Sequence, residues 1–266
     1  MIGLWIVLLV VVAAVVAAWM HGVGVRRRRK ELMGQGLTAA QRVRLGELFA
    51  LWRKMPEEVR NQVEGLMPVF LGEKSLEACG GLEEISEDMK LAIAAPACLL
   101  VINRSIDDYS KLRSVLVYPD AYVVKDEWGV EDVRLGESWG AGSVVLAWKS
   151  VLAGDRNPED GLNVVLHEFA HQLDQADGAG DGVPELDDNE DYGRWSAAFR
   201  PAYEEFCEVV RKGQPSVIDD YGATNPAEFF AVVTETFFER ARKLKREEPE
   251  LYEELRRFYG MDPEGW

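Results

Sequence analysis

The chain has 266 residues, 47% of them hydrophobic and 29% charged, which is the composition of a folded protein with one or two domains. Its formal net charge of −16 argues against a general nucleic-acid-binding protein, so we expect no direct contact with nucleic acid. The charge is uneven, because five of the 30 basic residues form the run RRRRK at 26–30 and residues 1–30 contain no acid. The remainder therefore carries 25 basic against 46 acidic residues, a net of −21.

The chain begins with a long apolar segment. Residues 2–20 carry no charged side chain, and this length of helix spans roughly 28 Å, about the thickness of the hydrocarbon core of a bilayer. Trp5 and Trp19 lie near its two ends, where indole rings favour the interface. A cleaved secretory signal has its basic residues before the apolar core, whereas here RRRRK follows it. We therefore expect a single-pass membrane protein in which the body of the chain, after the apolar segment, faces the cytoplasm.

The sequence predicts three regions: an N-terminal transmembrane anchor (1–25), a basic juxtamembrane linker (26–36) and one compact α+β domain (37–266). Within the domain, periodic helical segments come first, short β-branched and aromatic runs follow, and helices return apart from an acidic loop at 177–191. The expected helices are 39–55, with a stripe of Val43, Leu45, Leu48, Leu51 and Trp52; 56–67, opened by Pro56; and 85–103, capped by Ser86 and containing Pro96. The expected strands are 114–119, 121–125 and 143–148.

A further helix carries the stretch NVVLHEFAHQLD, residues 163–174. Asn157 as a cap and Pro158 in the first turn predict that this helix begins there and ends at about Asp174. Its expected core-facing stripe is Leu162, Leu166, Phe169 and Leu173.

His167 and His171 are the only histidines of the domain, and their spacing places both on one helix face, one turn apart. Two imidazole nitrogens in this arrangement can bind one zinc ion, and Glu168 lies close enough to act on a zinc-bound water. The alternative is an amphipathic helix with two ordinary histidines. The helical context of the HExxH pattern favours a zinc site.

A catalytic zinc has three protein ligands, and the lack of another histidine points to a carboxylate as the third. The segment DDYGATNPAEFFAVVTETFF, residues 219–238, offers Glu228 in the first turn of a helix capped by Asn225 and opened by Pro226. Glu228 is equally well placed as the glutamate of a capping box, so the local pattern leaves both roles open.

The pairing of HEFAHQLD with YGATNPAEFFA resembles the zinc peptidases of the Mlc titration factor A family, and over these two motifs it is similar to the catalytic domain of anthrax lethal factor. The likeness to the titration factor family extends through GLEEISEDMKLAIAAPACLLVIN, VYPDAYVV and GESWGAGSVVLAW, over most of residues 60–240. The resemblance implies a gluzincin-like zinc peptidase domain with a small sheet beside the HExxH helix. It implies that Glu228 completes the zinc shell and that Tyr221 lies at the active site. The apolar N-terminal segment departs from the soluble family members.

The expected chemistry is hydrolysis of a peptide bond by a zinc-activated water, with Glu168 as general base and the Tyr221 hydroxyl as a donor to the oxyanion. For Tyr221 the alternative is an aromatic packed under a loop. Asp174 and Glu235 are candidates to accept the second N–H of the histidine ligands, and a solvated acid is the alternative for each. The strand at 143–148 is a candidate edge for pairing with an extended peptide, or else an ordinary core strand.

Two functions follow. The first is a membrane-tethered zinc metallopeptidase acting on a peptide or protein substrate. The second is a regulatory protein that sequesters a partner, since the resemblance implies binding of a transcriptional repressor. The intact HExxH with Glu168 favours catalysis, because a pure binding module has no need of a general base.

Overall fold

The computed structural model describes residues 2–125, 131–134, 136–139, 142–154 and 156–266. The α-helices are α1 (Ile2–Met33), α2 (Ala39–Leu48), α3 (Glu57–Glu73), α4 (Glu87–Leu99), α5 (Trp148–Gly154), α6 (Val164–Asp174), α7 (Asn189–Arg211), α8 (Pro226–Glu239), α9 (Ala241–Glu247) and α10 (Pro249–Tyr259). The 3-10 helices are η1 (Ala50–Arg53), η2 (Ile106–Tyr109), η3 (Asp220–Ala223) and η4 (Pro263–Gly265). The strands are β1 (Ser75–Ala78), β2 (Ser114–Tyr118), β3 (Tyr122–Lys125), β4 (Glu131–Arg134), β5 (Gly136–Trp139) and β6 (Ser143–Ala147).

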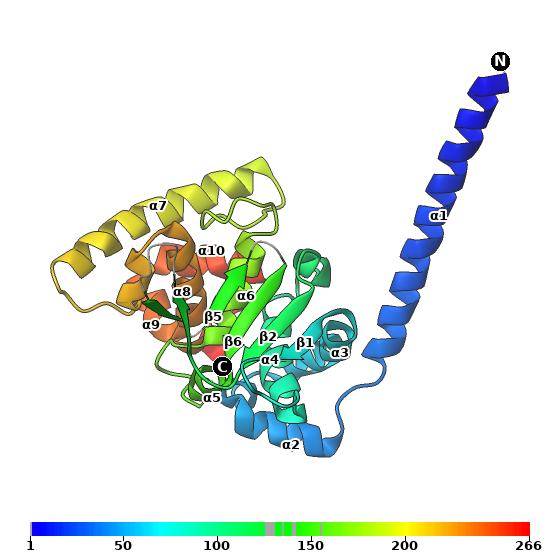
Figure 1. The fold of residues 1–266 in the computed structure, drawn as a ribbon. Helices are drawn as coiled ribbons and strands as arrows, with labels where there is room; N and C mark the ends of the chain where they lie inside the picture. Colours follow the sequence, from blue (N-terminus) through cyan, green and yellow to red (C-terminus); the bar gives the residue numbers. More distant parts are fainter. Residues whose placement is uncertain (1, 126–130, 135, 140–141, 155) are drawn as a thin grey trace.

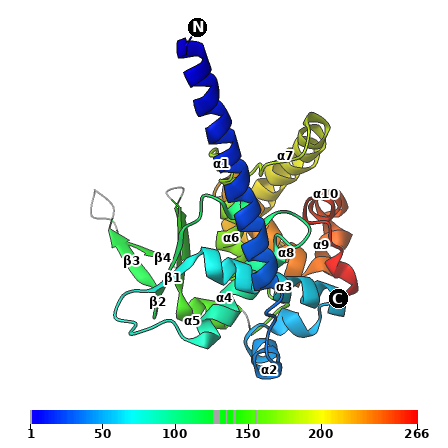
Figure 2. The ribbon, with the colours of Figure 1, turned by 90° about the vertical axis from the view of Figure 1, so that its right-hand side faces the viewer.

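A small mixed sheet lies at the centre of a helix-rich body, and α1 projects from that body as a separate rod (Figures 1 and 2). The sheet has the order β1-β2-β6-β5, with β1, β2 and β6 parallel and β5 antiparallel to β6. Val115 on β2 pairs with Val144 on β6, and both side chains are fully buried, as expected for strands covered on both faces. The α6 helix packs against β5 and β6, so the small sheet does lie beside the HExxH helix.

The three predicted strands correspond to β2, β3 and β6, whereas β1, β4 and β5 had not been predicted. Of the two alternatives left open for the strand at 143–148, the structure shows the core strand and not a free edge, because β6 is hydrogen-bonded to β2 on one side and β5 on the other. Among the described strands of this sheet, β1 and β5 are the edges, and β3 and β4 pair separately.

The predicted helices of the first half are confirmed with different ends. The segment 39–55 divides into α2 and η1, because Phe49 takes an extended conformation that allows both Phe49 and Trp52 to be buried. Val43 is 67% exposed and does not belong to the apolar stripe. The helix opened by Pro56 continues beyond residue 67 to Glu73 as α3. In α4, Ser86 is the cap and Pro96 lies inside a continuous helix.

The basic segment expected as a linker is helical to Met33, so α1 includes most of residues 26–36. Its last turns are attached to the body. Arg29 donates hydrogen bonds to both carboxylate oxygens of Glu73 at 2.6 and 3.0 Å, and to Asp107 at 2.7 Å. Leu32 packs over Gly72, where an added Cβ would lie 3.1 Å from its Cδ1. The end of α1 is therefore fixed against α3 and η2 by charge and by shape.

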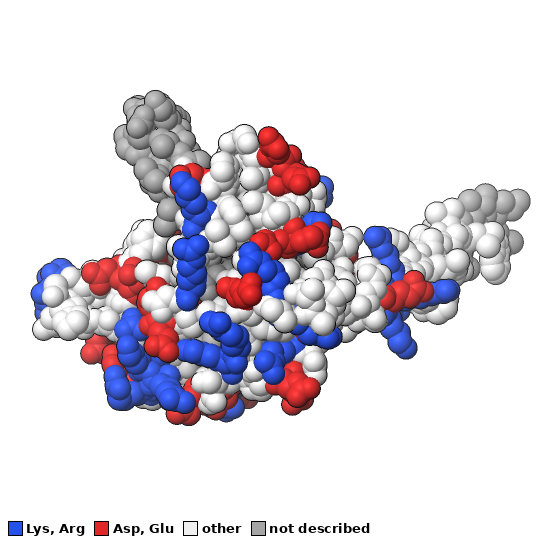
Figure 3. Space-filling model, turned by 90° about the horizontal axis from the view of Figure 1, so that it is seen from below, with Lys and Arg blue, Asp and Glu red and all other residues white. Residues whose placement is uncertain are grey.

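The outer part of α1 is apolar and exposed: Trp5 and Trp19 are each 65% exposed, and the helix is long and apolar enough to cross a membrane. Seen from below, acidic and basic side chains are interspersed over the body, so this face is not uniformly acidic (Figure 3).

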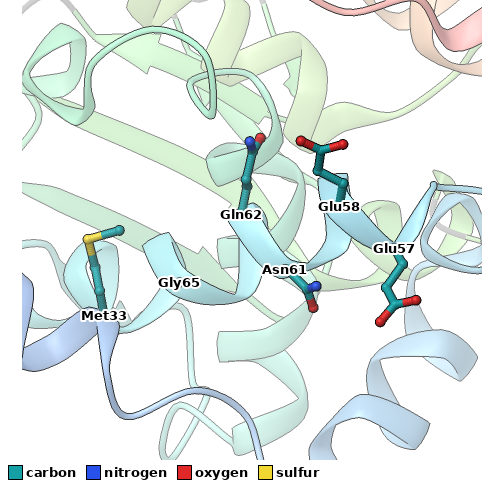
Figure 4. Close-up of a pocket in the computed structure, with 6 residues that line it drawn as sticks. All are labelled: Met33, Glu57, Glu58, Asn61, Gln62 and Gly65. Carbon is teal, nitrogen blue, oxygen red and sulfur yellow. The ribbon is translucent and has the colours of Figure 1, made fainter.

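A shallow groove of about 580 Å³ lies where Met33 meets α3 (Figure 4). Its other lining residues are Glu57, Glu58, Asn61, Gln62 and Gly65. None of these residues belongs to α6 or α8, so the helix that carries the two histidines does not line this groove.

Candidate metal centre

The helix that carries the histidines begins later than the sequence suggested. Asn163 is the N-cap of α6, and its Oδ1 accepts hydrogen bonds from the N–H groups of Val165 and Leu166 at 3.2 and 3.1 Å. Asn157 instead bonds to Asp160 within the preceding turn. Leu162 lies before the helix and is 49% exposed, so its assignment to the core-facing stripe is wrong.

One face of α6 is held in the core. Leu166, Phe169 and Leu173 are buried, as predicted. The ring of Phe169 packs 5.6 Å from that of Phe70 on α3 and 5.3 Å from that of Tyr109 on η2, measured between centroids. This aromatic contact fixes the rotation of α6 about its axis, and the imidazoles of the helix then meet α8.

The third predicted ligand comes from the start of α8. Asn225 caps this helix, and its Oδ1 accepts a hydrogen bond from the N–H of Glu228 at 3.0 Å. Pro226 occupies the first turn. The Glu228 carboxylate lies against the two histidines of α6. The cap thus orients Glu228 toward the neighbouring helix.

The structure brings the three predicted ligands together. Oε2 of Glu228 lies 3.0 Å from Nε2 of His167 and 3.2 Å from Nε2 of His171, and the two Nε2 atoms are 3.2 Å apart. Within the described part of the chain, these three residues form the cluster whose donor atoms could hold a metal ion. Two imidazole nitrogens and one carboxylate oxygen at these distances are a set of electron-pair donors that can bind one metal cation.

The pKa shifts of His167 and Glu228 both indicate that a positive charge is favourable at this cluster. Burial lowers the pKa of His167, but Glu235 and Glu228 outweigh it and leave this pKa well above its usual value. Burial raises the pKa of Glu228, but hydrogen bonds with His167 and His171 outweigh it and hold this pKa at about 2. Glu228 is therefore a carboxylate at neutral pH, the form that binds metals.

A second carboxylate of α8, that of Glu235, contacts the ring nitrogen of His167 that does not face the other two ligands. Oε1 of Glu235 lies 2.7 Å from Nδ1 of His167, and Glu235 also accepts the backbone N–H of Asn163. Asn163 in turn donates its Nδ2 to Glu239 at 3.2 Å. Glu235 thus occupies the position predicted for a partner of a histidine ligand, and it joins α8 to the first turn of α6.

The other predicted residues lie at different positions. Glu168 is on α6 beside His167 and is 5% exposed. Tyr221 on η3 is 56% exposed, so it is not packed under the loop, and its ring centroid is 5.9 Å from that of His167. Asp174 is fully buried rather than solvated, and its Oδ1 accepts the N–H of Gly182.

Sequence reasoning missed Asn163, Glu239 and Gly182. An asparagine directly before the apolar run VVLHEFAH was an available signal for the cap. Glu239 lies one turn after Glu235 on α8. The role of Gly182 depends on backbone contacts with other elements, and no local pattern indicates it.

Comparison with known proteins supports the interpretation of this cluster as a metal site. The family model of the glucose-regulated metallo-peptidase M90 matches residues 24–260. The chain is 32% identical over 222 residues to Mlc titration factor A of Cronobacter sakazakii, covering 79% of this chain and 82% of that protein. It is 35% identical over 221 residues to Mlc titration factor A of Klebsiella pneumoniae, with coverages of 78% and 81%.

An uncharacterized protein of Synechocystis sp. is 38% identical over 267 residues, and 97% of each chain is covered. About eight residues of this chain lie outside that alignment, fewer than its apolar segment contains, so the likeness extends into α1. The match to the family model over most of the chain, together with the His-His-Glu cluster, leads to one conclusion: this chain belongs to the glucose-regulated metallo-peptidase M90 family, and Mlc titration factor A is its relative.

Proposed function

We propose that this chain is a zinc-dependent metallopeptidase of the gluzincin type, anchored in a membrane by α1 with its catalytic domain on the cytoplasmic side. The observation that carries the proposal is the convergence of His167, His171 and Glu228 on one point. In a tetrahedral zinc site with bonds of about 2.0–2.1 Å, donor atoms lie about 3.3 Å apart. The distances of 3.0–3.2 Å in this cluster fit that set.

His167, His171 and Glu228 would hold the ion, and zinc bound there would supply an activated water for attack on the peptide bond. Glu168 would accept the proton of the attacking water and pass it to the leaving amine. Its burial supports this role, because a carboxylate away from bulk solvent transfers protons to a bound substrate rather than to solvent. The Tyr221 hydroxyl would donate a hydrogen bond to the oxyanion that develops from the peptide carbonyl.

Strand β5 offers a place for the substrate. It is an edge of the sheet among the described strands, and it packs beside α6. An extended peptide can add to such an edge through backbone hydrogen bonds, which recognise a main chain with little regard to its sequence. We therefore propose that the substrate pairs with β5 and not with the strand at 143–148.

The membrane location is supported by the exposed apolar surface of α1 and by the basic residues that follow it. The orientation follows from the positive-inside rule.

The test compares the full-length chain in detergent with its Glu168→Gln variant on a peptide library. We expect turnover to fall by about 10² to 10⁴, while the zinc content of the purified protein stays the same. Glu190→Gln, which changes an exposed acid on α7, serves as the control and keeps full turnover. Equal turnover by the native chain and Glu168→Gln would refute the peptidase mechanism.

A second function, the sequestration of a transcriptional repressor or another regulatory partner, is supported by the name of the relatives, Mlc titration factor A. Binding of such a partner that is unchanged in the inactive Glu168→Gln variant would support this function.

A further inference from the structure

The loop that follows α6 makes a close backbone contact with α8. Gly182 has φ +84°, and a Cβ added to it would lie 2.3 Å from the carbonyl oxygen of Pro226 and 3.1 Å from the nitrogen of Ala227. These two atoms belong to the first turn of α8, directly before Glu228. A side chain at position 182 therefore cannot be accommodated unless the loop or this turn moves.

Gly182 is also held from two other helices. Its N–H donates to Oδ1 of Asp174 on α6 at 2.8 Å, and its carbonyl accepts Nε1–H of Trp195 on α7 at 3.3 Å. Trp195 is 1% exposed and stacks on Phe199 with ring centroids 3.8 Å apart, so it is a rigid support. Three helices thus meet at one glycine.

The residues that Gly182 contacts on α6 and α8 lie close in sequence to two of the proposed metal ligands. Asp174 follows His171 by three residues on α6, and Pro226 precedes Glu228 by two on α8. Because Nε2 of His171 and Oε2 of Glu228 are 3.2 Å apart, a shift of either helix end by about 1 Å is large on the scale of the site.

We propose that Gly182 is a positioning residue for the metal centre. Its backbone is hydrogen-bonded to Asp174 and Trp195 and packs against the Pro226–Ala227 peptide. These contacts fix the distance between His171 and Glu228. The inference rests on the proposed zinc site. It adds Gly182, which is not a ligand, as a residue that determines the affinity for zinc. No side chain larger than hydrogen fulfils this role.

The experiment uses the full-length chain in detergent and measures zinc affinity by chelator competition and the visible spectrum of the cobalt-loaded protein. In Gly182→Ala we expect at least tenfold weaker zinc binding, as for other residues that orient ligands, and an altered cobalt spectrum. The matched control is Gly180→Ala, in the same loop. Gly180 also has positive φ (+63°), but an added Cβ there meets the flexible Cγ of Gln175 at 3.3 Å rather than backbone. It should keep the native affinity and spectrum.

A second pair of variants covers the case in which Gly182→Ala does not fold. Asp174→Ala removes the acceptor for the Gly182 N–H and should weaken zinc binding, whereas Asp174→Asn keeps an acceptor oxygen and should restore it. Loss of thermal stability with unchanged zinc affinity in Gly182→Ala, or equal weakening by Gly180→Ala, would overturn the inference and leave the zinc site intact. Absence of zinc binding by the native chain would overturn both proposals.

Discussion

Nδ1 of His167 lies 2.7 Å from Oε1 of the buried Glu235, so the ring nitrogen that faces away from the cluster is engaged by a carboxylate. An imidazole held in this way presents the lone pair of Nε2 to a metal. We predict that Glu235→Gln weakens zinc binding about 10- to 100-fold while the chain stays folded. Chelator competition measures the affinity, and Glu250→Gln, an exposed acid on α10, is the control. An unchanged affinity in Glu235→Gln would show that this contact does not orient the ligand.

Glu228 is predicted to be the third ligand. Glu228→Ala should purify with less than one zinc per chain, because only two imidazoles remain. Removing the metal from the native chain with a chelator should lower its melting temperature, since a ligand at 100 times its Kd stabilises the folded state by about 2.7 kcal/mol. The chelator should have little effect on the melting of Glu228→Ala. A full zinc complement in that variant would assign the third position to another residue.

A variant of Tyr221 tests whether its hydroxyl stabilises the oxyanion, separately from metal binding. Tyr221→Phe should lower kcat about 10²- to 10³-fold with little change in KM, because the hydroxyl donates to charge that exists only in the transition state. Its zinc affinity and melting temperature should match those of the native chain, since the side chain is 56% exposed. A rise in KM at constant kcat would instead indicate a role in binding the substrate.

Asp174 should give stability a pH dependence of known sign. Burial raises the pKa of its carboxyl to about 6, against about 3.9 in an unfolded chain. The folded state therefore binds more protons between these values, so this group's stabilisation is complete below pH 4 and is lost as the pH rises through 6. The loss is about 3 kcal/mol in the free energy of unfolding. Denaturant titrations of the native chain and Asp174→Asn, with chelator present, should diverge over this range, and parallel curves would contradict the assignment.

Arg29 should hold the end of α1 against the body. Arg29→Ala removes its hydrogen bonds to Glu73 and Asp107, and we expect faster proteolysis between α1 and α2. The control is Arg27→Ala, since the Arg27 side chain is 82% exposed and pairs with Glu31 within the same helix. Limited proteolysis in detergent measures the difference. Equal rates for both variants would show that the contact does not restrain α1.

The local parts of the site could be predicted from the sequence. The spacing of His167 and His171 fixes their common helix face, and the Asn-Pro cap places Glu228 in a first turn. The local pattern left open whether Glu228 is a ligand or a capping-box glutamate, and its carboxylate lies against His167 and His171 in the structure. The start of α6 was misplaced because two asparagines, Asn157 and Asn163, each precede a plausible helix, and only the packing selects the second.

Features that depend on distant elements could not be predicted. Strand β6 has the pattern of either an edge or a core strand, and only its pairing with β2 and β5 decides between them. The close approach of Gly182 to Pro226 joins residues 44 positions apart, and sequence periodicity carries no information at that separation.

The helix α1 runs without interruption from its apolar segment into the turn that Arg29 and Leu32 attach to α3. A protein anchored in this way does not sample a wide volume beneath a bilayer, as one on a flexible tether does. With α1 anchored in a bilayer as proposed, the metal centre would be held at one height and one tilt relative to the lipid surface. Selection of substrates by the proposed peptidase would then depend on where a peptide bond is presented as well as on its sequence. A soluble peptide and a membrane-bound one of the same sequence would become different substrates.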